Sequence, residues 1–175
     1  MKVPAKLFKK LDDLGIKYNL VEHRPVFTAY DAAQTMKRKL EQITKSLLVK
    51  AGKDHFLVHV PASKNIDLKK LARILKVAKV EIPSEKAIVK VLKIKPGTLS
   101  SFGFIHHIAS IVDKSLLKSK KAVFSTGSLI NSLELSVKDF LKTSEMQVGV
   151  FAVTKKFKKV KPQKKVKKVK NKKKK

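Results

Sequence analysis

The chain has 175 residues and a net charge of +29 at pH 7, because 42 lysines and arginines face only 13 aspartates and glutamates. Its 43% of hydrophobic residues is enough for one packed domain and excludes a wholly disordered chain. It contains no cysteine, no apolar run of the roughly 20 residues that a membrane span needs and no signal peptide at its start, so we expect a soluble cytoplasmic protein without disulfides or thiolate metal sites.

The first elements along the chain are predicted to be a helix over residues 4–14, a strand over 18–22 and a helix over 30–41. Leu7, Leu11 and Leu14 fall at helical spacing, and Gly15 follows where a helix often ends. The strand rests on an imperfect polar and apolar alternation, and Pro25 ends it.

The middle of the chain predicts strands over residues 45–51 and 56–60 and helices over 67–75 and 84–92. Gly52 lies in a hairpin-like turn between the two strands. Asp67 and Ser84 stand just before the apolar positions of the two helices, where their side chains can accept hydrogen bonds from backbone N–H groups.

The last part of the body predicts a loop over residues 95–103, strands over 104–112, 122–125 and 148–153, and a short helix over 137–141. Helices and strands therefore alternate along the chain. This order is typical of an α/β or α+β domain around a mixed sheet.

Lysines dominate residues 155–175, which hold 14 lysines in 21 residues and no acid. We expect a disordered Lys-rich tail there, after a domain over residues 1–154 that itself carries +15. Such charge favours a nucleic acid as partner, through contacts to phosphates. An anionic membrane surface, or a tail that only aids solubility, are the alternatives.

Lys45 stands out because it opens an apolar strand face, in line with Leu47 and Val49. Such a lysine either reaches outward to solvent or points into a pocket. In a pocket it would supply a fixed positive charge for a phosphate or a developing oxyanion.

Two glycine- and serine-containing segments, residues 97–103 and 125–128, are candidates for ligand-binding loops. Glycine lets backbone N–H groups come close to a ligand oxygen. Ordinary surface turns would have the same composition.

The five histidines give little support for a metal site. His55 and His59 would share a strand face, whereas the adjacent His106 and His107 would point to opposite faces. The chain also lacks a nucleophile elbow, a phosphate-binding P-loop and a dinucleotide fingerprint. We therefore expect no metal, no cofactor and no Ser-His-acid triad.

Seven segments follow one another in a recognisable order: residues 21–33, 44–50, 59–62, 67–71, 97–103, 124–128 and 133–136. Their order resembles the YbaK family of prolyl-tRNA-synthetase-associated editing domains, and the similarity runs from about residue 4 to residue 142. It implies a compact α/β domain with a mixed, partly barrel-like sheet and flanking helices. It also implies hydrolysis of the ester between a wrong amino acid and the 3′ end of tRNA.

The resemblance assigns a functional role to Lys45, which would position the terminal adenosine or the aminoacyl group. Water would attack without a protein nucleophile, and backbone N–H groups around residues 97–103 and 125–127 would stabilise the oxyanion. The matched motifs assign substrate binding to His23, Thr28, Tyr30, Ser46, Gly97, Ser100, Ser101, Phe102, Gly103, Ser125, Gly127 and Ser128.

One position departs from the family pattern, because Ser101 stands where family members commonly have proline. The change loosens the loop and adds a hydroxyl, which leaves the amino acid specificity open. We expect the tail to hold tRNA through Lys155, Lys156, Lys158, Lys159, Lys164 and Lys165. A non-catalytic RNA-binding module and a domain that docks on a synthetase are the alternatives.

Overall fold

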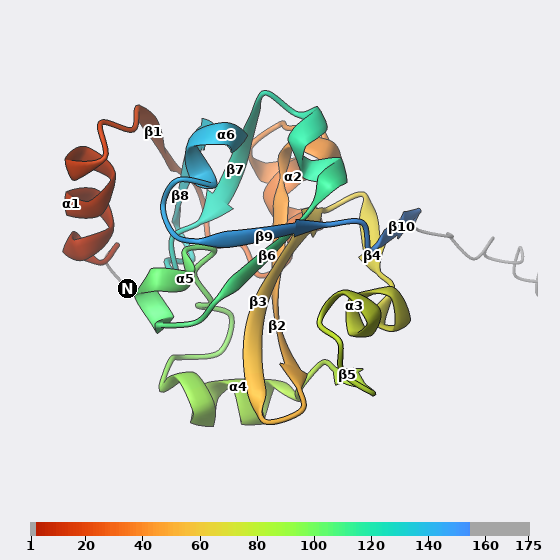
Figure 1. Ribbon diagram of the computed structural model, residues 1–175. Coiled ribbons are helices and arrows are strands. Elements are labelled where there is room, and N and C mark those ends of the chain that lie inside the picture. The colour runs from red at the N-terminus through yellow and green to blue at the C-terminus, as the bar shows by residue number, and fades with distance from the viewer. Residues whose placement is uncertain (1–2, 155–175) are drawn as a thin grey trace, which may run out of the picture.

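The computed structural model describes residues 3–154 and arranges them as short helices around three β-sheets (Figure 1). The helices are α1 (Ala5–Asp13), α2 (Ala29–Thr35), α3 (Leu68–Ile74), α4 (Glu85–Leu92), α5 (Gly103–His106) and α6 (Val137–Phe140), with the 3-10 turns η1 (Leu40–Gln42) and η2 (Lys114–Lys118). The strands are β1 (Tyr18–Glu22), β2 (Thr44–Ala51), β3 (Asp54–Pro61), β4 (Lys64–Ile66), β5 (Val80–Glu81), β6 (Ser110–Asp113), β7 (Lys121–Ser125), β8 (Asn131–Ser136), β9 (Met146–Gly149) and β10 (Ala152–Thr154).

The largest sheet has the strand order β5-β2-β3-β6-β9 and is mixed, since β3, β6 and β9 run parallel and the other pairs antiparallel. A second sheet has the order β1-β8-β7, and β10 pairs with β4 in a third. The expected α/β class with a mixed sheet is confirmed. The described strands do not close into a barrel, so the expected barrel-like form is met only loosely.

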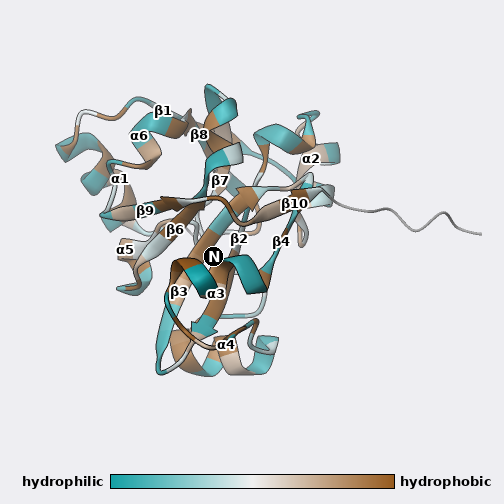
Figure 2. Ribbon diagram, turned by 45° about the vertical axis from the view of Figure 1, so that its right-hand side comes forward, coloured by the Kyte–Doolittle hydropathy of each residue, from teal (hydrophilic) through white to brown (hydrophobic). Residues whose placement is uncertain are grey.

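The β2–β3 hairpin runs through the middle of the molecule (Figure 1). Its turn contains Gly52 at φ +63, a conformation that glycine adopts at little cost. The register pairs Ala51 with Asp54 at the turn and continues to Thr44 opposite Pro61. Figure 2 shows apolar colour along β2, β3 and β6, where the sheet is buried.

Three clusters of apolar side chains hold the sheets together. One packs α1 and α6 on the second sheet, with Leu7, Phe124 and Phe140 fully buried. Another joins β2, β3 and β6 to α3. The third is small and lies at α2, where Ile43 makes an isolated parallel bridge to Val123 of β7 and so brings the two larger sheets together.

Most sequence-predicted elements are confirmed, including the strand over residues 18–22 and the helices that Asp67 and Ser84 cap. The helix predicted over residues 30–41 is wrong in its second half. It ends at Thr35 because Lys37 takes a left-handed conformation, φ 50, and η1 then forms separately.

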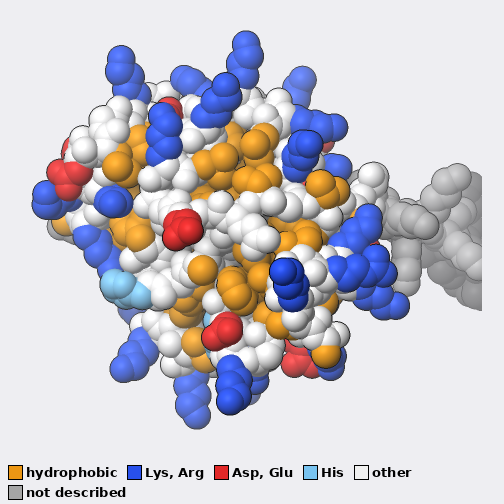
Figure 3. All heavy atoms as spheres, viewed as in Figure 1, with side chains coloured by type: hydrophobic (Ala, Val, Ile, Leu, Met, Phe, Trp, Pro, Cys, Tyr) orange, Lys and Arg blue, Asp and Glu red, His pale blue; other side chains and the backbone are white. Residues whose placement is uncertain are grey.

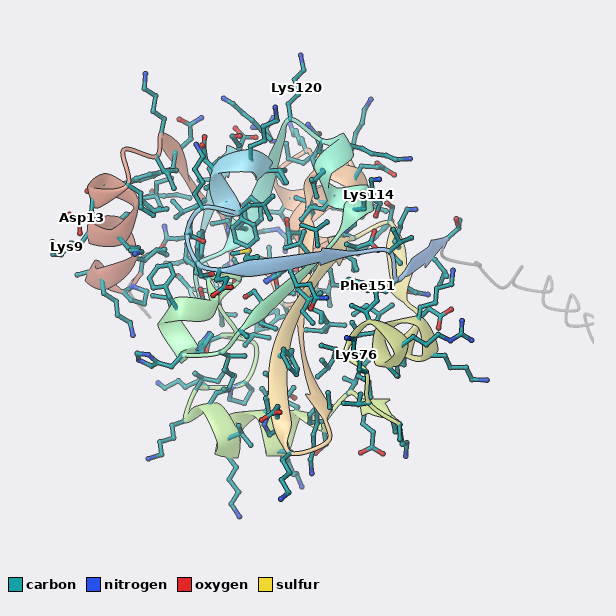
Figure 4. All side chains as sticks on the ribbon, viewed as in Figure 1. Lys9, Asp13, Lys76, Lys114, Lys120 and Phe151 are labelled. Carbon is teal, nitrogen blue, oxygen red and sulfur yellow. The ribbon has the colours of Figure 1, made fainter. Side chains whose placement is uncertain are left out.

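Two strand predictions near the C-terminal end of the body are also wrong in part. Residues 104–112 were expected to be one strand, but the chain makes the helical turn α5, turns at His107 (φ 55), and enters β6 only at Ser110. The strand expected over residues 148–153 is split into β9 and β10, because Phe151 turns into the core between them (Figure 4).

The side chain of Asp113 stabilises the break between β9 and β10. Its carboxylate, almost fully buried, accepts hydrogen bonds from the N–H groups of Phe151 and Ala152, both at 2.7 Å, and from Ser115 N at 2.8 Å.

No helix within residues 3–154 has both the length and the apolar character needed to cross a membrane. The predicted tail over residues 155–175, which includes the six lysines predicted to bind RNA, lies outside the described residues.

Candidate active site

A cavity of about 440 Å³ opens where the two larger sheets meet. Its walls come from the start of β2, the start of α2, one side of α4, the loop before α5, the end of β7 and the start of β8. The sequence-predicted residues that line it are Thr28, Lys45, Ser46, Gly97, Ser125 and Ser128. The fold therefore brings five of the twelve predicted substrate-binding residues together with Lys45 around one hollow.

Lys45 is half-buried and lines this cavity, which places it in a pocket and not as a purely solvent-directed lysine. Its Nζ donates to the backbone carbonyl of Lys64 at 2.6 Å and to Oδ1 of Asn65 at 3.4 Å, both in β4. These oxygens hold the ammonium group at the edge of the cavity. The site thus contains a positive charge whose position is fixed by the neighbouring strand.

Ser46, the next residue of β2, is the centre of a buried hydroxyl network. Its Oγ lies 2.9 Å from Nδ1 of His59, which is directly opposite it in the β2–β3 register, and it donates to Ser101 Oγ at 2.9 Å. Ser101 Oγ accepts a further hydrogen bond from Ser125 N at 3.0 Å. The network ties three segments together: β2, the loop before α5, and the end of β7.

His59 is fully buried, and desolvation lowers the pKa of its imidazole from 6.5 to about 3. Phe140 packs on it edge to face, with ring centroids 5.2 Å apart. Within the described residues no hydrogen-bond partner reaches its Nε2. A ring that stays neutral and lacks an orienting carboxylate is a weak base, so Ser46 is poorly equipped to act as an activated nucleophile.

Hydrogen bonds that use backbone atoms of the loop before α5 join this loop to β7. Ser101 N donates to Ser125 O at 2.9 Å, Ser125 Oγ donates to Leu99 O at 3.0 Å, and Gly127 N donates to Ser125 Oγ at 3.2 Å. Ser128 N also donates within its own turn. Several N–H groups that the sequence suggested for an oxyanion therefore already bond to protein acceptors.

His106 anchors the same loop from the other side. Its Nε2 accepts from Ser100 N at 3.1 Å, which requires a ring that is unprotonated at that nitrogen. Burial, together with the charge of Lys6, lowers the pKa of His106 and favours this neutral form. His106 and His59 both lie behind the site and support it, a role that the sequence analysis predicted for neither residue.

The remaining predicted residues lie outside the cavity. His23 is next to it, with Nε2 2.9 Å from the hydroxyl of the lining residue Ser132, while Tyr30 is 58% exposed on α2. Ser100, Ser101, Phe102, Gly103 and Gly127 lie behind the cavity wall. Gly103 serves packing, because a Cβ there would lie 2.4 Å from the carbonyl oxygen of Ile108.

One wall of the cavity is apolar and was missing from the sequence prediction. It is formed by Val26, Phe27, Ile88, Val89, Ile94 and Leu99. The amphipathic pattern of α4 was visible in the sequence, but it does not reveal that the apolar face lines a cavity and leaves the helix without a fully buried residue. The site therefore pairs an apolar wall with a polar floor of hydroxyls and the ammonium group of Lys45.

Charge around the cavity favours an anionic ligand. Lys95 joins Lys45 in the lining, against one acidic lining residue, Glu85. Figure 3 shows lysine and arginine side chains projecting all round the outline of one face, with few acidic ones between them. Among residues 3–154, no three His, Asp or Glu side chains come together as a metal site.

A family model described as an aminoacyl-tRNA editing domain matches residues 23–143. The prolyl-tRNA editing protein ProX of Acetoanaerobium sticklandii is 31% identical over 123 residues, which cover 67% of this chain and 75% of ProX. These matches agree with the similarity to the YbaK editing domains seen in the sequence motifs.

Solved structures show the same fold. The hypothetical protein APE2540 superposes with a TM-score of 0.77 at 19% identity, over 85% of this chain and 99% of that one. A protein proposed to be a trans-editing enzyme for prolyl-tRNA synthetase gives 0.69 at 20% identity, over 83% and 94%. On the matching family model and the ProX similarity, the chain belongs to the aminoacyl-tRNA editing domain family, a family of aminoacyl-tRNA deacylases.

Proposed function

We propose that the cavity binds the 3′ end of a wrongly charged tRNA and hydrolyses its aminoacyl ester, with Lys45 positioning the substrate. The observation that carries the proposal is the ammonium group of Lys45, which is held by Lys64 O at the edge of a cavity with one apolar and one polar wall. An amino acid side chain fits the part of the apolar wall formed by Ile88, Val89, Ile94 and Leu99. The ester and ribose oxygens then face the hydroxyls and the ammonium group.

Water is the proposed nucleophile. Its oxygen attacks the ester carbonyl carbon, the bond from that carbon to the ribose oxygen breaks, and a proton from the water ends on that ribose oxygen. The products are a free amino acid and a tRNA with both terminal hydroxyls restored. The neutral, weakly basic His59 behind Ser46 supports water over a serine nucleophile.

Stabilisation of the oxyanion is proposed for Lys45 and for the N–H groups of Gly97 and Leu99. Both of these residues line the cavity, and in the described part of the chain their N–H groups have no protein acceptor. Donors that are already in place cost no reorganisation when charge develops on the carbonyl oxygen.

The proposed tRNA is one charged by prolyl-tRNA synthetase. The similarity to the prolyl-tRNA editing protein of Acetoanaerobium sticklandii and to the proposed trans-editing enzyme for prolyl-tRNA synthetase supports this choice. We further propose that residues 155–175 form a separate Lys-rich arm that binds the tRNA backbone, as their 14 lysines suggest. A cytoplasmic location follows from a substrate of translation.

A panel of mischarged tRNAs, tested with the wild type, Lys45→Ala and Lys50→Ala, tests the activity. Lys50 is a matched control because it lies on the same strand and is exposed outside the cavity. We expect one or a few esters to be hydrolysed, with turnover reduced roughly 100-fold or more by Lys45→Ala and little changed by Lys50→Ala. Tight tRNA binding without hydrolysis of any ester would favour the non-catalytic module.

A further inference from the structure

Phe27 is the most exposed large apolar side chain of the described residues, at 71%. Water contact with most of an aromatic ring forgoes the stabilisation that burial would bring. The neighbouring residue Thr28, in contrast, caps α2 by accepting from Asp31 N at 3.0 Å. The exposure of Phe27 therefore occurs in a well-ordered part of the fold.

The backbone around Phe27 is fixed on both sides. Phe27 N donates to Asp31 Oδ2 at 3.4 Å, and Val26 N donates to Leu129 O at 3.0 Å. Arg24 adds an ion pair to Asp31 at 2.9 Å. The ring is thus presented from a rigid support, as a binding platform must be.

The ring borders the cavity that holds Lys45. Phe27 lines it, and a Cβ placed on Gly97 would lie 4.0 Å from Phe27 Cδ1, so the ring stands next to the loop before α5. Lys95, two residues before Gly97, lines the same cavity. An exposed aromatic face and a lysine therefore flank the opening.

This combination matches an unpaired nucleotide. Single-stranded RNA is held by bases stacked on aromatic rings and by cations near the phosphates. We propose that the ring of Phe27 is the stacking platform for the terminal base of the tRNA, while the aminoacyl ester on that nucleotide enters the cavity. The inference rests on the proposed function and names how the nucleotide, as distinct from the amino acid, is held.

A stacked base and a contact to the amino acid make different predictions. If Phe27 contacted only the amino acid, its loss would weaken the binding of every ester of that amino acid equally. If it stacks on the base, its loss affects only substrates that carry a base. Aminoacyl-tRNA and the methyl ester of the same amino acid separate the two cases.

Three variants provide the kinetic test. Phe27→Leu keeps an apolar side chain without a ring, Phe27→Trp keeps a ring, and Val150→Ala alters another exposed apolar residue, 62% exposed and outside this cavity. We expect Phe27→Leu to raise KM for aminoacyl-tRNA by roughly 5- to 150-fold at nearly constant kcat. Phe27→Trp and Val150→Ala should stay near the wild type, and Phe27→Leu should lower hydrolysis of the methyl ester far less than hydrolysis of aminoacyl-tRNA. An equal loss on the methyl ester, or no loss on tRNA, would overturn the inference.

A binding measurement keeps the inference testable if the wild type hydrolyses nothing. A short single-stranded RNA with 2-aminopurine as its 3′-terminal base loses fluorescence when that base stacks. We expect the wild type and Val150→Ala to quench it, Phe27→Trp to quench it as well, and Phe27→Leu to bind with the fluorescence retained. Quenching by Phe27→Leu equal to the wild type would refute the stacking role, whatever the fate of the deacylase proposal.

Discussion

The hydroxyl of Ser101 lies 2.9 Å from that of Ser46, and this contact joins the loop before α5 to the strand that carries Lys45. Ser101 is fully buried and also accepts from Ser125 N. The residue that departs from the family pattern is therefore a bridge behind the cavity and not part of its lining.

Removing the Ser101 hydroxyl should weaken the attachment of the loop before α5 to β2 and β7. We expect Ser101→Ala to lower the free energy of unfolding by about 1–3 kcal/mol, because Ser125 N loses its acceptor in a buried position. The kcat for ester hydrolysis should fall with it. Urea unfolding followed by circular dichroism measures the first effect. Ser119→Ala, whose hydroxyl bonds Glu41 O at the surface, is the control and should cost little.

His59 should make the stability depend on pH. Its pKa is about 3 in the folded protein and about 6.5 when solvated, so the unfolded chain binds the proton more readily. Stability from this group is complete above about pH 6.5 and decreases as the pH falls toward 3. Between pH 6.5 and 4.5 the loss should be roughly 2–3 kcal/mol.

His59→Leu should flatten this part of the profile, measured as the free energy of unfolding at several pH values. Ser46→Ala removes the hydrogen-bond partner at 2.9 Å but keeps the buried ring, so its slope should match that of the wild type. An unchanged slope in His59→Leu would mean that other groups dominate the acid response.

Loss of the buried carboxylate of Asp113 should strongly destabilise the fold. Burial alone would raise the pKa of its carboxyl, but hydrogen bonds from Ser115, Phe151 and Ala152 outweigh burial and lower it. The charged form is thus the native one, and its contribution is lost only in acid, as the pH falls below the usual value of 3.8. We expect Asp113→Ala to destabilise the protein by about 3 kcal/mol or more, since several buried donors lose their acceptor.

Thermal unfolding of Asp113→Ala against Asp13→Ala measures this effect. Asp13 pairs with Lys9 at 3.1 Å, but both side chains are more than half exposed, and the two residues lie on the outer surface of α1 (Figure 4). Such a pair contributes about 0–1 kcal/mol. Similar melting temperatures for the two variants would show that the carboxylate of Asp113 is dispensable.

The lysines of residues 155–175 should determine how salt weakens tRNA binding. Replacing Lys155, Lys156, Lys158, Lys159, Lys164 and Lys165 with glutamine should reduce the slope of log K against log salt by about 4 to 5. A variant with the tail residues in shuffled order keeps the charge and should keep the slope. Filter binding at several salt concentrations distinguishes these outcomes, and an unchanged slope in the glutamine variant would remove the tail from the binding model.

Local patterns predicted the elements that local chemistry determines. The caps at Asp67 and Ser84 and the turn at Gly52 were readable because each depends on a few neighbouring residues. The register of the hairpin was also within reach. Counting outward from the turn places His59 opposite Ser46, so the sequence held a signal for this pair that was not used.

Long-range packing accounts for what the sequence could not predict. Ser101 meets Ser46 across 55 residues and Ser125 across 24, and no periodicity encodes such contacts. Motif order brought Phe102 and Gly103 into the predicted site along with Gly97, although only Gly97 lines the cavity. Which side of a loop faces a hollow depends on the segments around it.

The hydrogen bond between Lys45 and β4 places the active-site charge close to the end of the described chain. Its ammonium group is held by the carbonyl of Lys64, and Lys64 pairs with Thr154, the last residue that the structure describes. The chain therefore continues into residues 155–175 from a point one strand away from the active-site charge. On the proposal that those residues bind RNA, this attachment point would keep the RNA at high local concentration beside the cavity and would speed its capture without changing the chemical step.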